Sequence, residues 1–568
     1  MSWSSGVAPS GCAGGRRLAP DWQGRAGSGK RLRRASRRGR PRVGRTRCMI
    51  PTSNLASLLL QTARRLPDRP ALIWRDQCWT WAEVAARAAA AAAALRARGI
   101  GAGDRVLVHA RNGNAIFESC WACWMIGAVW VPTNFRLSPP EAAYLAANAG
   151  CRAHVFDTAF PEHRAVARAE NAACILEVAI GQGAGLSWDD LVAEGTAAPV
   201  TDTEAVGRDH PAWLFYTSGT TGRPKGGTLT HGQLAFVVVN HIADLMPGLS
   251  AQDASLVVAP LSHGAGIHAL AQVARGAVSV LLPGERLDVP EAWRLVQVHR
   301  VSNMFTVPTI LNALCRDASV DAFDHASLRH VIYAGAPMYR EDQKHALRKL
   351  GRCLVQYFGL GEVTGNITVL PPEWHSLEDD PAFPIGSCGY PRTGIEVAIL
   401  DAAHVRLAAG ETGEICVRGP AVMAGYFENQ SANEKAFAGG WFHTGDLGHL
   451  DVRGFLHITG RQSDMYISGG SNVYPREVEE ALLTHPAVAE ACVVGVPHEK
   501  WGETGVAVLV AAEGAVIDTA EVMAQLDRRL GRYKWPSRIV VWDALPRSGY
   551  GKVPKNEVKR LLAERGDV

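Results

Sequence analysis

Short apolar runs alternate with helix-length segments between residues 80 and 337. Runs that are apolar along their whole length are typical of strands buried on both faces of a parallel sheet. The alternation therefore predicts parallel sheets with crossover helices, an α/β architecture. The runs are GDRVLVHA (103–110), AWLFYTS (212–218), ASLVVAP (254–260), AVSVLLP (277–283), NMFTVP (303–308) and HVIYAGAP (330–337).

The segment TWAEVAARAAAAAAALRARG, residues 80–99, predicts a helix with defined ends. Thr80 and Glu83 have the spacing of a capping box, in which each side chain binds the other residue's backbone N–H. Gly99 lies where a helix of this length would end, because glycine readily takes the left-handed conformation of a helix terminus.

The pattern changes after residue 385. Short strands separated by Gly- and Asp-containing turns (394–401, 412–419 and 454–460) predict an antiparallel or barrel-like subdomain. A compact α+β pattern then follows to the end of the chain. We place a domain boundary at about 460–464, with a large N-terminal domain at 49–460 and a small C-terminal domain at 464–568.

Charge is distributed unevenly. Residues 1–48 hold 13 of the 59 Lys and Arg residues and a single acid, and the rest of the chain carries 46 basic against 54 acidic residues. This basic head lacks apolar periodicity, which predicts disorder. It fits a targeting segment, a tail for nucleic acid or membrane surfaces, or translation that begins at Met49, and we favour the last. The mildly acidic body does not have the composition of a nucleic-acid-binding face.

The twelve cysteines are scattered. Cys120 and Cys123 form a C-x-x-C without a second cysteine pair or a nearby histidine, so we expect two buried cysteines on a core helix rather than a zinc site. Scattered cysteines suit a reducing compartment, and we expect a cytoplasmic protein. The apolar run 116–132 is too short and interrupted for a membrane span.

The stretch YTSGTTGRPKGG, residues 216–227, has the donors to hold a polyphosphate. A nucleotide-hydrolysing P-loop needs lysine directly after its last glycine and a hydroxyl directly after the lysine. Here Arg223 and Pro224 separate Gly222 from Lys225, and Gly226 follows the lysine. The loop therefore serves another phosphate chemistry.

The loop resembles the phosphate-binding signature of the adenylate-forming (AMP-binding) superfamily, which includes acyl-CoA synthetases, luciferases and peptide-synthetase adenylation domains. Four further stretches occur in the family's order, and the resemblance covers the chain from about residue 50 to its end. They are LSHGAGIH (261–268), YFGLGEVTG (357–365), WFHTGDLG (441–448) with TGRQSDMYISGGSNVYPREVEE (459–480), and PRSGYGKVPK (546–555).

The resemblance assigns an ATP site. Glu362 matches the family's magnesium-associated glutamate, and a carboxylate oxygen suits that hard cation. Phe358, next to Gly359, falls where a tyrosine usually stacks on adenine, and a phenyl ring can also stack. Asp446 matches the carboxylate that accepts both ribose hydroxyls, and Arg461 matches a second ribose contact. The β- and γ-phosphates would be cradled by Thr217, Ser218, Gly219, Thr220, Thr221, Gly222 and Lys225.

The resemblance also assigns the C-terminal domain a part in each half-reaction, adenylation and then thioester formation. Lys552 matches the lysine that bridges the substrate carboxylate and the α-phosphate, so that Lys552, Glu362 and Lys225 are the expected catalytic residues. The family's small C-terminal domain is mobile and turns to form the thioester site. Gly469 and Gly470 match the segment that lines the pantetheine tunnel, which favours coenzyme A as acceptor.

An acyl pocket is implied at two further places. His263 and Gly264 match one wall, and Gly335, Ala336 and Pro337 match the opposite wall. The stretches SHGAGIHAL and YAGAPM contain no Lys or Arg that would pair with a second substrate carboxylate. We therefore expect an apolar monocarboxylic acid, fatty or aryl.

Two residues depart from the family pattern. Gly361 replaces a threonine whose hydroxyl commonly touches the α-phosphate, and Thr364 would compensate only if the loop shifted. We expect Gly361→Thr to preserve or raise adenylation. Ser463, at the hinge, stands where the family usually has Asp or Lys.

Together these features predict an acyl-CoA synthetase with ATP, Mg²⁺ and coenzyme A as cofactor and co-substrates, and with no nucleic-acid partner. The rivals are an adenylating enzyme with a carrier-protein or other acceptor and a non-catalytic nucleotide-binding homologue. The sequence leaves the oligomeric state open.

Overall fold

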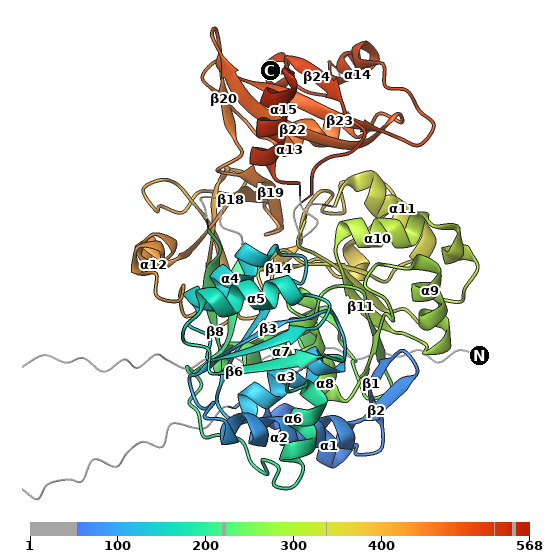
Figure 1. Cartoon of the computed structure of the whole chain (residues 1–568). Helices are drawn as coiled ribbons and strands as arrows, with labels where there is room; N and C mark the ends of the chain where they lie inside the picture. Colours follow the sequence, from blue (N-terminus) through green and yellow to red (C-terminus); the bar gives the residue numbers. More distant parts are fainter. Residues whose placement is uncertain (1–53, 184, 218–222, 337, 528, 548–552) are drawn as a thin grey trace, which may run out of the picture. The chain divides into compact units, whose positions relative to one another are not determined.

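The computed structural model describes residues 54–183, 185–217, 223–336, 338–527, 529–547 and 553–568 (Figure 1). The expectations for residues 1–48, for 218–222, for Pro337 and for Lys552 fall outside these ranges. The described chain forms two large, mostly parallel sheets, an antiparallel sheet, a mixed C-terminal sheet and a separate strand pair. The expected α/β architecture is confirmed.

The first large sheet has the strand order β6-β5-β3-β4-β7-β8. Its neighbouring strands are parallel, except that β7 and β8 form an antiparallel hairpin. Successive side chains point to opposite faces, so Val106 lies in one hydrophobic core and Leu107 in another. The strands are β3 (Arg105–His109), β4 (Val129–Thr133), β5 (Ala153–Asp157), β6 (Leu176–Ile180), β7 (Pro211–Thr217) and β8 (Lys225–Thr230).

The second large sheet has the order β13-β12-β11-β9-β10-β1-β2 and is parallel apart from the β1–β2 pair. All the apolar runs expected to be buried strands pair in one of these two sheets. The strands of the second sheet are β1 (Pro70–Trp74), β2 (Gln77–Thr80), β9 (Ala254–Val257), β10 (Val278–Leu281), β11 (Asn303–Thr306), β12 (His330–Tyr333) and β13 (Leu354–Gln356).

Helices fill the space between the two sheets and cover their outer faces. The largest core combines side chains from both sheets with those of α1 (Ser57–Arg65), α2 (Trp81–Ala97), α3 (Asn114–Met125), α6 (Trp188–Gly195), α7 (His231–Asn240) and α8 (Gly264–Arg275). Figure 1 places α4 (Pro139–Asn148) and α5 (Pro161–Glu170) over the first sheet. The other face of the second sheet packs on α9 (Val289–Val298), α10 (Pro308–Arg316) and α11 (Arg340–Leu350).

The segment after residue 385 is antiparallel, as its turns predict. Strands β16 (Glu396–Leu400), β17 (Gly413–Arg418), β18 (Phe442–Leu450) and β19 (Leu456–Arg461) pair in chain order. The remaining short elements before residue 442, in chain order, are η1 (His241–Leu245), η2 (Ala318–Asp321), η3 (Gly361–Val363), β14 (Thr368–Val369), η4 (Pro372–Trp374), β15 (Tyr390–Pro391), α12 (Gln430–Ala436) and η5 (Ala438–Gly440).

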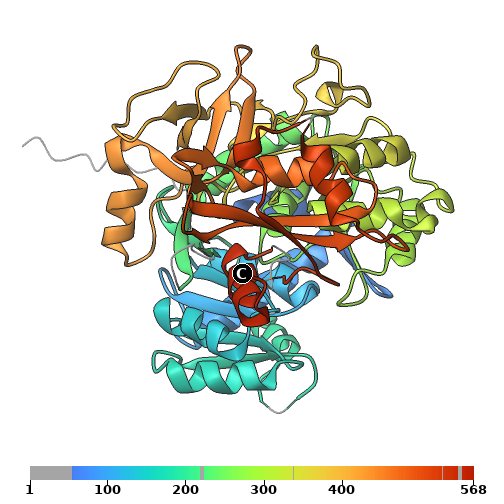
Figure 2. The same ribbon diagram turned by 90° about the horizontal axis from the view of Figure 1, so that it is seen from above.

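The segment after β19 contains helices and strands in an α+β arrangement, as expected. Its sheet has the order β21-β20-β23-β22 with β24 beside β23. Helix α15 (Lys555–Arg565), which precedes the C-terminus marked in Figure 2, packs through Val558 and Leu562 against Val494 of β22. The other elements are β20 (Tyr466–Ser468), β21 (Ser471–Val473), α13 (Pro475–Leu482), β22 (Val488–His498), β23 (Gly502–Ala511), α14 (Thr519–Leu526), η6 (Arg532–Lys534) and β24 (Arg538–Val541).

Three local expectations are also confirmed. Thr80 caps α2 in a reciprocal capping box with Glu83, and Gly99 follows the helix with a φ of 81°. Cys120 and Cys123 are buried on α3. Of the helices in the described ranges, none combines the length and apolarity that crossing a membrane requires.

Candidate active site

The phosphate loop is anchored by a hairpin. Thr217 ends β7, Lys225 begins β8, and the two residues are directly paired across the strands. Residues 218–222, which carry the other expected phosphate contacts, lie outside the described residues. The hairpin therefore fixes both ends of the loop and brings the Thr217 hydroxyl and the Lys225 ammonium to the same end of the sheet.

Glu362 lies beside this hairpin. Its carboxylate is 8% exposed and its Oε1 accepts hydrogen bonds from the Thr217 hydroxyl at 2.7 Å and from the Tyr426 hydroxyl at 3.1 Å. The Lys225 ammonium lies 5.2 Å from the centre of the Tyr426 ring. Burial, together with the Glu362 charge, raises the pKa of Tyr426, so this phenol keeps its proton and donates it. Three distant segments thus converge on one carboxylate.

Asp446 and Arg461 form an ion pair at the end of a second hairpin. They are cross-strand partners in β18 and β19, and the Arg461 Nε lies 2.9 Å from an Asp446 carboxylate oxygen. The Asp446 side chain is 6% exposed, whereas that of Arg461 is 37% exposed. The arginine therefore holds the carboxylate in one orientation from its open side. This geometry suits a carboxylate that must accept two neighbouring hydroxyl groups.

The loop of Phe358 is held by backbone contacts. The Phe358 carbonyl accepts hydrogen bonds from the N–H groups of Ile367 and Thr368, and its ring is half-buried. A Cβ added to Gly359 would lie 2.3 Å from the carbonyl carbon of Gly365. Only glycine fits at this position because two backbone segments cross there.

Gly361 is enclosed by neighbouring side chains, which corrects the expectation for its replacement by threonine. A Cβ at this position would lie 2.6 Å from the Phe215 ring and 2.8 Å from the Thr217 methyl group. Phe215 is buried, so a threonine would displace its ring. Thr364 does not compensate, because it is buried and its hydroxyl donates towards the carbonyls of Val363 at 2.5 Å and Ala421 at 3.3 Å.

The expected acyl-pocket residues lie at the ends of two elements. His263 is the residue before α8, its Nδ1 is 2.8 Å from the Ser262 hydroxyl, and its ring meets Phe215 edge-on at 5.3 Å. A Cβ on Gly264 would come within 2.5 Å of the Phe305 ring. Gly335, with a φ of 84°, and the half-buried Ala336 follow β12.

The remaining expected residues lie between β19 and β20 and in the C-terminal sheet. Ser463 follows β19, and its hydroxyl donates to Asp464 at 3.2 Å. Gly469 and Gly470 form the turn between β20 and β21, with φ values of 56° and 81°. A two-residue hairpin turn with both φ values positive favours glycine at both positions.

Sequence reasoning missed two residues of this site. Tyr426 joins Glu362 to Lys225, but a tyrosine in GYF carries no pattern that indicates this contact. Phe215 directly precedes the quoted loop, its ring contacts that of His263, and it lies where a Cβ on Gly361 would project. Strand periodicity could have placed it on the same face of β7 as Thr217.

Comparisons with known proteins identify the family of the chain. Residues 59–427 match the AMP-binding enzyme model, and residues 477–552 match the AMP-binding enzyme C-terminal domain. A feruloyl-CoA synthase from Amycolatopsis sp is 36% identical over 508 residues, which cover 89% of this chain and 98% of that protein. The medium/long-chain-fatty-acid–CoA ligase FadD8 of Mycobacterium tuberculosis is 33% identical over 531 residues, covering 90% and 91%.

Solved structures of one related enzyme cover the same region. The o-succinylbenzoate CoA synthetase MenE from Bacillus subtilis, in complex with its acyl-adenylate intermediate, is 34% identical with a TM-score of 0.77, covering 88% of this chain and 97% of that one. The same synthetase with ATP and magnesium ion is 32% identical with a TM-score of 0.76, covering 88% and 99%. The chain therefore belongs to the AMP-binding enzyme family, and it is an AMP-forming acid–thiol ligase.

Proposed function

We propose that this enzyme joins a compact aryl carboxylic acid to coenzyme A, using ATP and passing through an acyl-adenylate. The acid attacks the α-phosphate of ATP and releases pyrophosphate, and the thiol of coenzyme A then displaces AMP. The polar cluster of Thr217, Lys225 and Glu362 supports the first step, because fixed donors and charges stabilise the charge that develops on phosphate oxygens.

The Glu362 carboxylate fits a magnesium ion bound with ATP. Its Oε1 is oriented by the two hydroxyl donors, and a hard cation prefers such an oxygen ligand. When bound, Mg²⁺ neutralises phosphate charge. The protein itself orients the carboxylate, places Lys225 beside the Tyr426 ring, and holds Asp446 for the ribose hydroxyls.

The aromatic packing along β7 carries the proposal of a compact acid. Thr217, Phe215 and Trp213 alternate on one face of the strand, spaced by about 7 Å per two residues. The rings of Trp213 and Phe215 are 5.5 Å apart, and Trp213 meets Trp130 edge-on at 4.6 Å. Beyond Phe215, the space into which a long acyl chain would extend along this face is thus occupied by rings.

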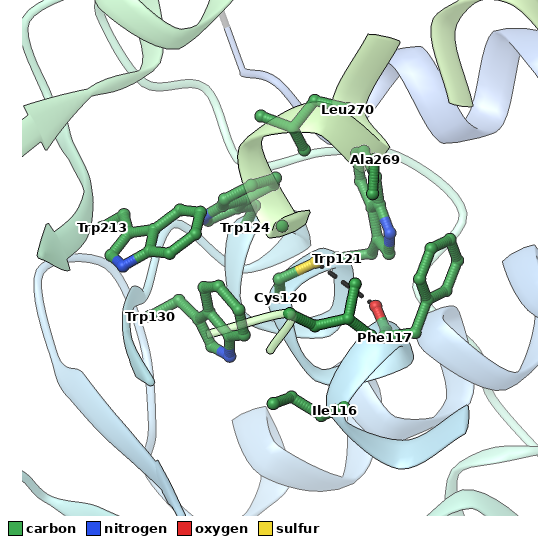
Figure 3. Close-up of a pocket in the computed structure, with 11 residues that line it drawn as sticks. Ile116, Phe117, Cys120, Trp121, Trp124, Trp130, Trp213, Ala269 and Leu270 are labelled. Carbon is green, nitrogen blue, oxygen red and sulfur yellow. Dashed lines mark hydrogen bonds between the residues drawn. The ribbon is translucent and has the colours of Figure 1, made fainter. Parts of the chain in front are cut away.

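The remaining space below these rings is small. A cavity of about 20 Å³ lies between α3, β7 and α8, which is room for about one water-sized group. Figure 3 shows Trp124, Trp130 and Trp213 on one side of it and Trp121 and Phe117 on the other. On Gly266, a Cβ would lie 3.1 Å from the Trp213 ring, so α8 packs closely on it. A long-chain fatty acid does not fit without displacing this core.

A panel of acids tests the proposal. Pyrophosphate release is measured with aryl acids of one and two rings and with fatty acids of increasing length, each with and without coenzyme A. We expect kcat/KM for the best aryl acid to exceed that for any acid of twelve or more carbons by at least about 10-fold, the scale on which pocket fit discriminates apolar groups. Equal use of long-chain acids would overturn the proposal.

A pair of tryptophan variants separates pocket shape from stability. Trp213→Phe should shift the preference towards longer acids, because it enlarges the space beside Phe215. Trp293→Phe is the matched control, since Trp293 is equally buried but lies in the core between the second sheet and α9. A common loss in both variants with unchanged preference would mean that Trp213 acts only through folding.

We also propose that residues 464–568 form a mobile domain that presents Lys552 for adenylation and then the segment of Gly469 and Gly470 for thioester formation. The order of the matched motifs supports this. Lys552→Ala should abolish adenylate formation while sparing thioester formation from supplied acyl-adenylate. Equal loss of both half-reactions would contradict the rotation. Replacement of coenzyme A by a carrier-protein thiol, with no activity on coenzyme A, would favour the rival acceptor.

A further inference from the structure

Three metal-ligating side chains of different types meet on one face of the β16–β19 sheet, apart from the cluster around Glu362. The His443 Nδ1 lies 2.8 Å from the Glu414 Oε2 and 3.4 Å from the Cys416 Sγ. All three atoms lie within 4.8 Å of one another. Neither the family comparison nor the proposed reaction assigns a role to this group.

Strand register brings the three residues together. Cys416 and His443 are directly paired across β17 and β18, and Glu414 lies two residues from Cys416 on the same strand. The register shifts between Glu414 and Cys416, which turns the carboxylate towards the histidine ring. Trp441 packs against the buried Cys416, so one side of the group is apolar. The side chains of Glu414 and His443 are 22% and 12% exposed, which leaves an entry on the other side.

The His443 and Glu414 atoms that point away from the group form hydrogen bonds with the backbone. The His443 Nε2 lies 3.1 Å from the Ala438 carbonyl, which can only accept, so Nε2 carries the proton and donates it. The Glu414 Oε1 accepts a hydrogen bond from the Gly445 N–H at 3.0 Å. Backbone partners of this kind commonly orient the ligands of a metal ion. The inner atoms Nδ1, Oε2 and Sγ therefore face one another.

We propose that Glu414, Cys416 and His443 bind a divalent transition-metal ion of the Zn²⁺ or Co²⁺ type. Nitrogen, carboxylate and thiolate donors together select such ions over Mg²⁺ and Ca²⁺. As the metal–sulfur bond forms, the Cys416 thiol releases its proton to solvent, and thiolate and carboxylate balance the two charges of the ion. Bonds of about 2.0–2.3 Å require only a small widening of the Nδ1–Oε2 pair.

A second imidazole lies beside the group. The exposed His404 ring is 5.0 Å from the His443 ring, edge-on. The alternative arrangement is a charged His443–Glu414 pair without metal. That pair gives no role to Cys416, whose Sγ lies 3.4 Å from the His443 Nδ1.

The consequence concerns the ribose site. Glu414 bonds the backbone of Gly445, the residue before Asp446. A metal ion at this place would tie β17 to the part of β18 that carries Asp446, and so stabilise the strand whose carboxylate is proposed to hold the ribose.

Cobalt titration of the full-length protein tests the site, because a thiolate bound to Co²⁺ gives a charge-transfer absorption band. We expect one equivalent of Co²⁺ to produce the band and Zn²⁺ to displace it. Cys416→Ser should abolish it. The matched control replaces Cys12, Cys48 and the exposed Cys78 by Ser, and should keep it. A band that survives in Cys416→Ser, or that disappears in the control, overturns the proposal.

Thermal unfolding in the presence of Zn²⁺ provides a second test that does not depend on the absorption band. Zn²⁺ should raise Tm of the wild type and of the triple-cysteine control, and not that of Cys416→Ser, because only a ligand bound to the native state stabilises it. His443→Gln removes a ligand without touching the thiol and should weaken Co²⁺ binding at least about 10-fold. If the wild type shows neither the Co²⁺ charge-transfer band nor a Zn²⁺-dependent rise in Tm, the proposal is overturned and His443 and Glu414 form a charged pair without metal.

Discussion

The two ends of the active site are built in different ways. At the proposed phosphate and ribose end, charged and hydroxyl side chains from distant segments are joined by hydrogen bonds, as Glu362 is to Thr217 and Tyr426. At the proposed acyl end, Phe215 and Trp213 are held by ring packing. At the first end the identity of the charged and hydroxyl groups determines function, whereas at the second the volume that the packed rings occupy determines it. Substitutions should therefore affect reaction rate at one end and substrate choice at the other.

The largest effect should follow removal of the Glu362 charge. Glu362→Gln is nearly isosteric but takes away the carboxylate that the cation and the phosphates need, and the loss of one such electrostatic group typically costs on the order of 10²–10³ in kcat. We expect a loss of that size in pyrophosphate release with every acid. Glu373→Gln, at an exposed glutamate in η4, is the control. A change of acid preference instead would break the division between the two ends.

A smaller effect is expected at the ribose contact. Asp446→Ala should raise KM for ATP by about 10–100-fold, the range expected when hydrogen bonds to a charged group are lost. The relative use of different acids should stay constant. Asp451→Ala, at the turn between β18 and β19, removes a carboxylate from the same hairpin and should leave KM for ATP unchanged. An unaltered ATP dependence in Asp446→Ala would remove this residue from the ribose site.

The third prediction concerns the place where the two ends touch. Gly361→Thr should lower adenylation about 10-fold, because overpacking against the Phe215 ring costs about 1–3 kcal/mol. Phe215→Val combined with Gly361→Thr should recover much of this loss, and the double-mutant cycle measures the coupling. Additive effects of the two substitutions would show that the ring and residue 361 act independently.

The smallest effect should come from Tyr426→Phe. This change removes one hydrogen bond to Glu362 and keeps the ring beside Lys225, so a loss of about 3–10-fold in pyrophosphate release is expected. The Tm should change little, since the ring stays in place. A loss as large as that of Glu362→Gln would assign the phenol a direct part in the reaction.

The polar end could be predicted largely from sequence because its residue types are dictated by chemistry. Glu362, Asp446, Arg461 and Lys225 each lie in a stretch that resembles a motif of the family, and the resemblance implies their roles. The structure places Glu362 beside the Thr217–Lys225 hairpin and pairs Asp446 with Arg461. Local rules also placed the Thr80 cap. The packing could not be predicted in this way. From the sequence, Gly361 is interpreted as the loss of a threonine hydroxyl. Only the fold shows that the Phe215 ring of β7 lies where a side chain at position 361 would project.

The same limit explains the residues that were missed. In the sequence, Phe215 is one residue of an apolar run, and Tyr426 lies in a short stretch without a recognisable motif. The contacts of both residues arise between segments that are far apart along the chain. The Cys416–His443 pair likewise depends on cross-strand register, which a single sequence does not fix.

The alternation along β7 has a consequence for how such an enzyme acquires new substrates. Leu214 and Tyr216 face the outer core beneath α4, whereas Trp213 and Phe215 face the core between the two large sheets. A pair of non-adjacent codons can therefore change the depth of the proposed pocket while the residues between them go on supporting the sheet. In the proposed pocket, selection for a longer or shorter acid can act on this strand in small steps.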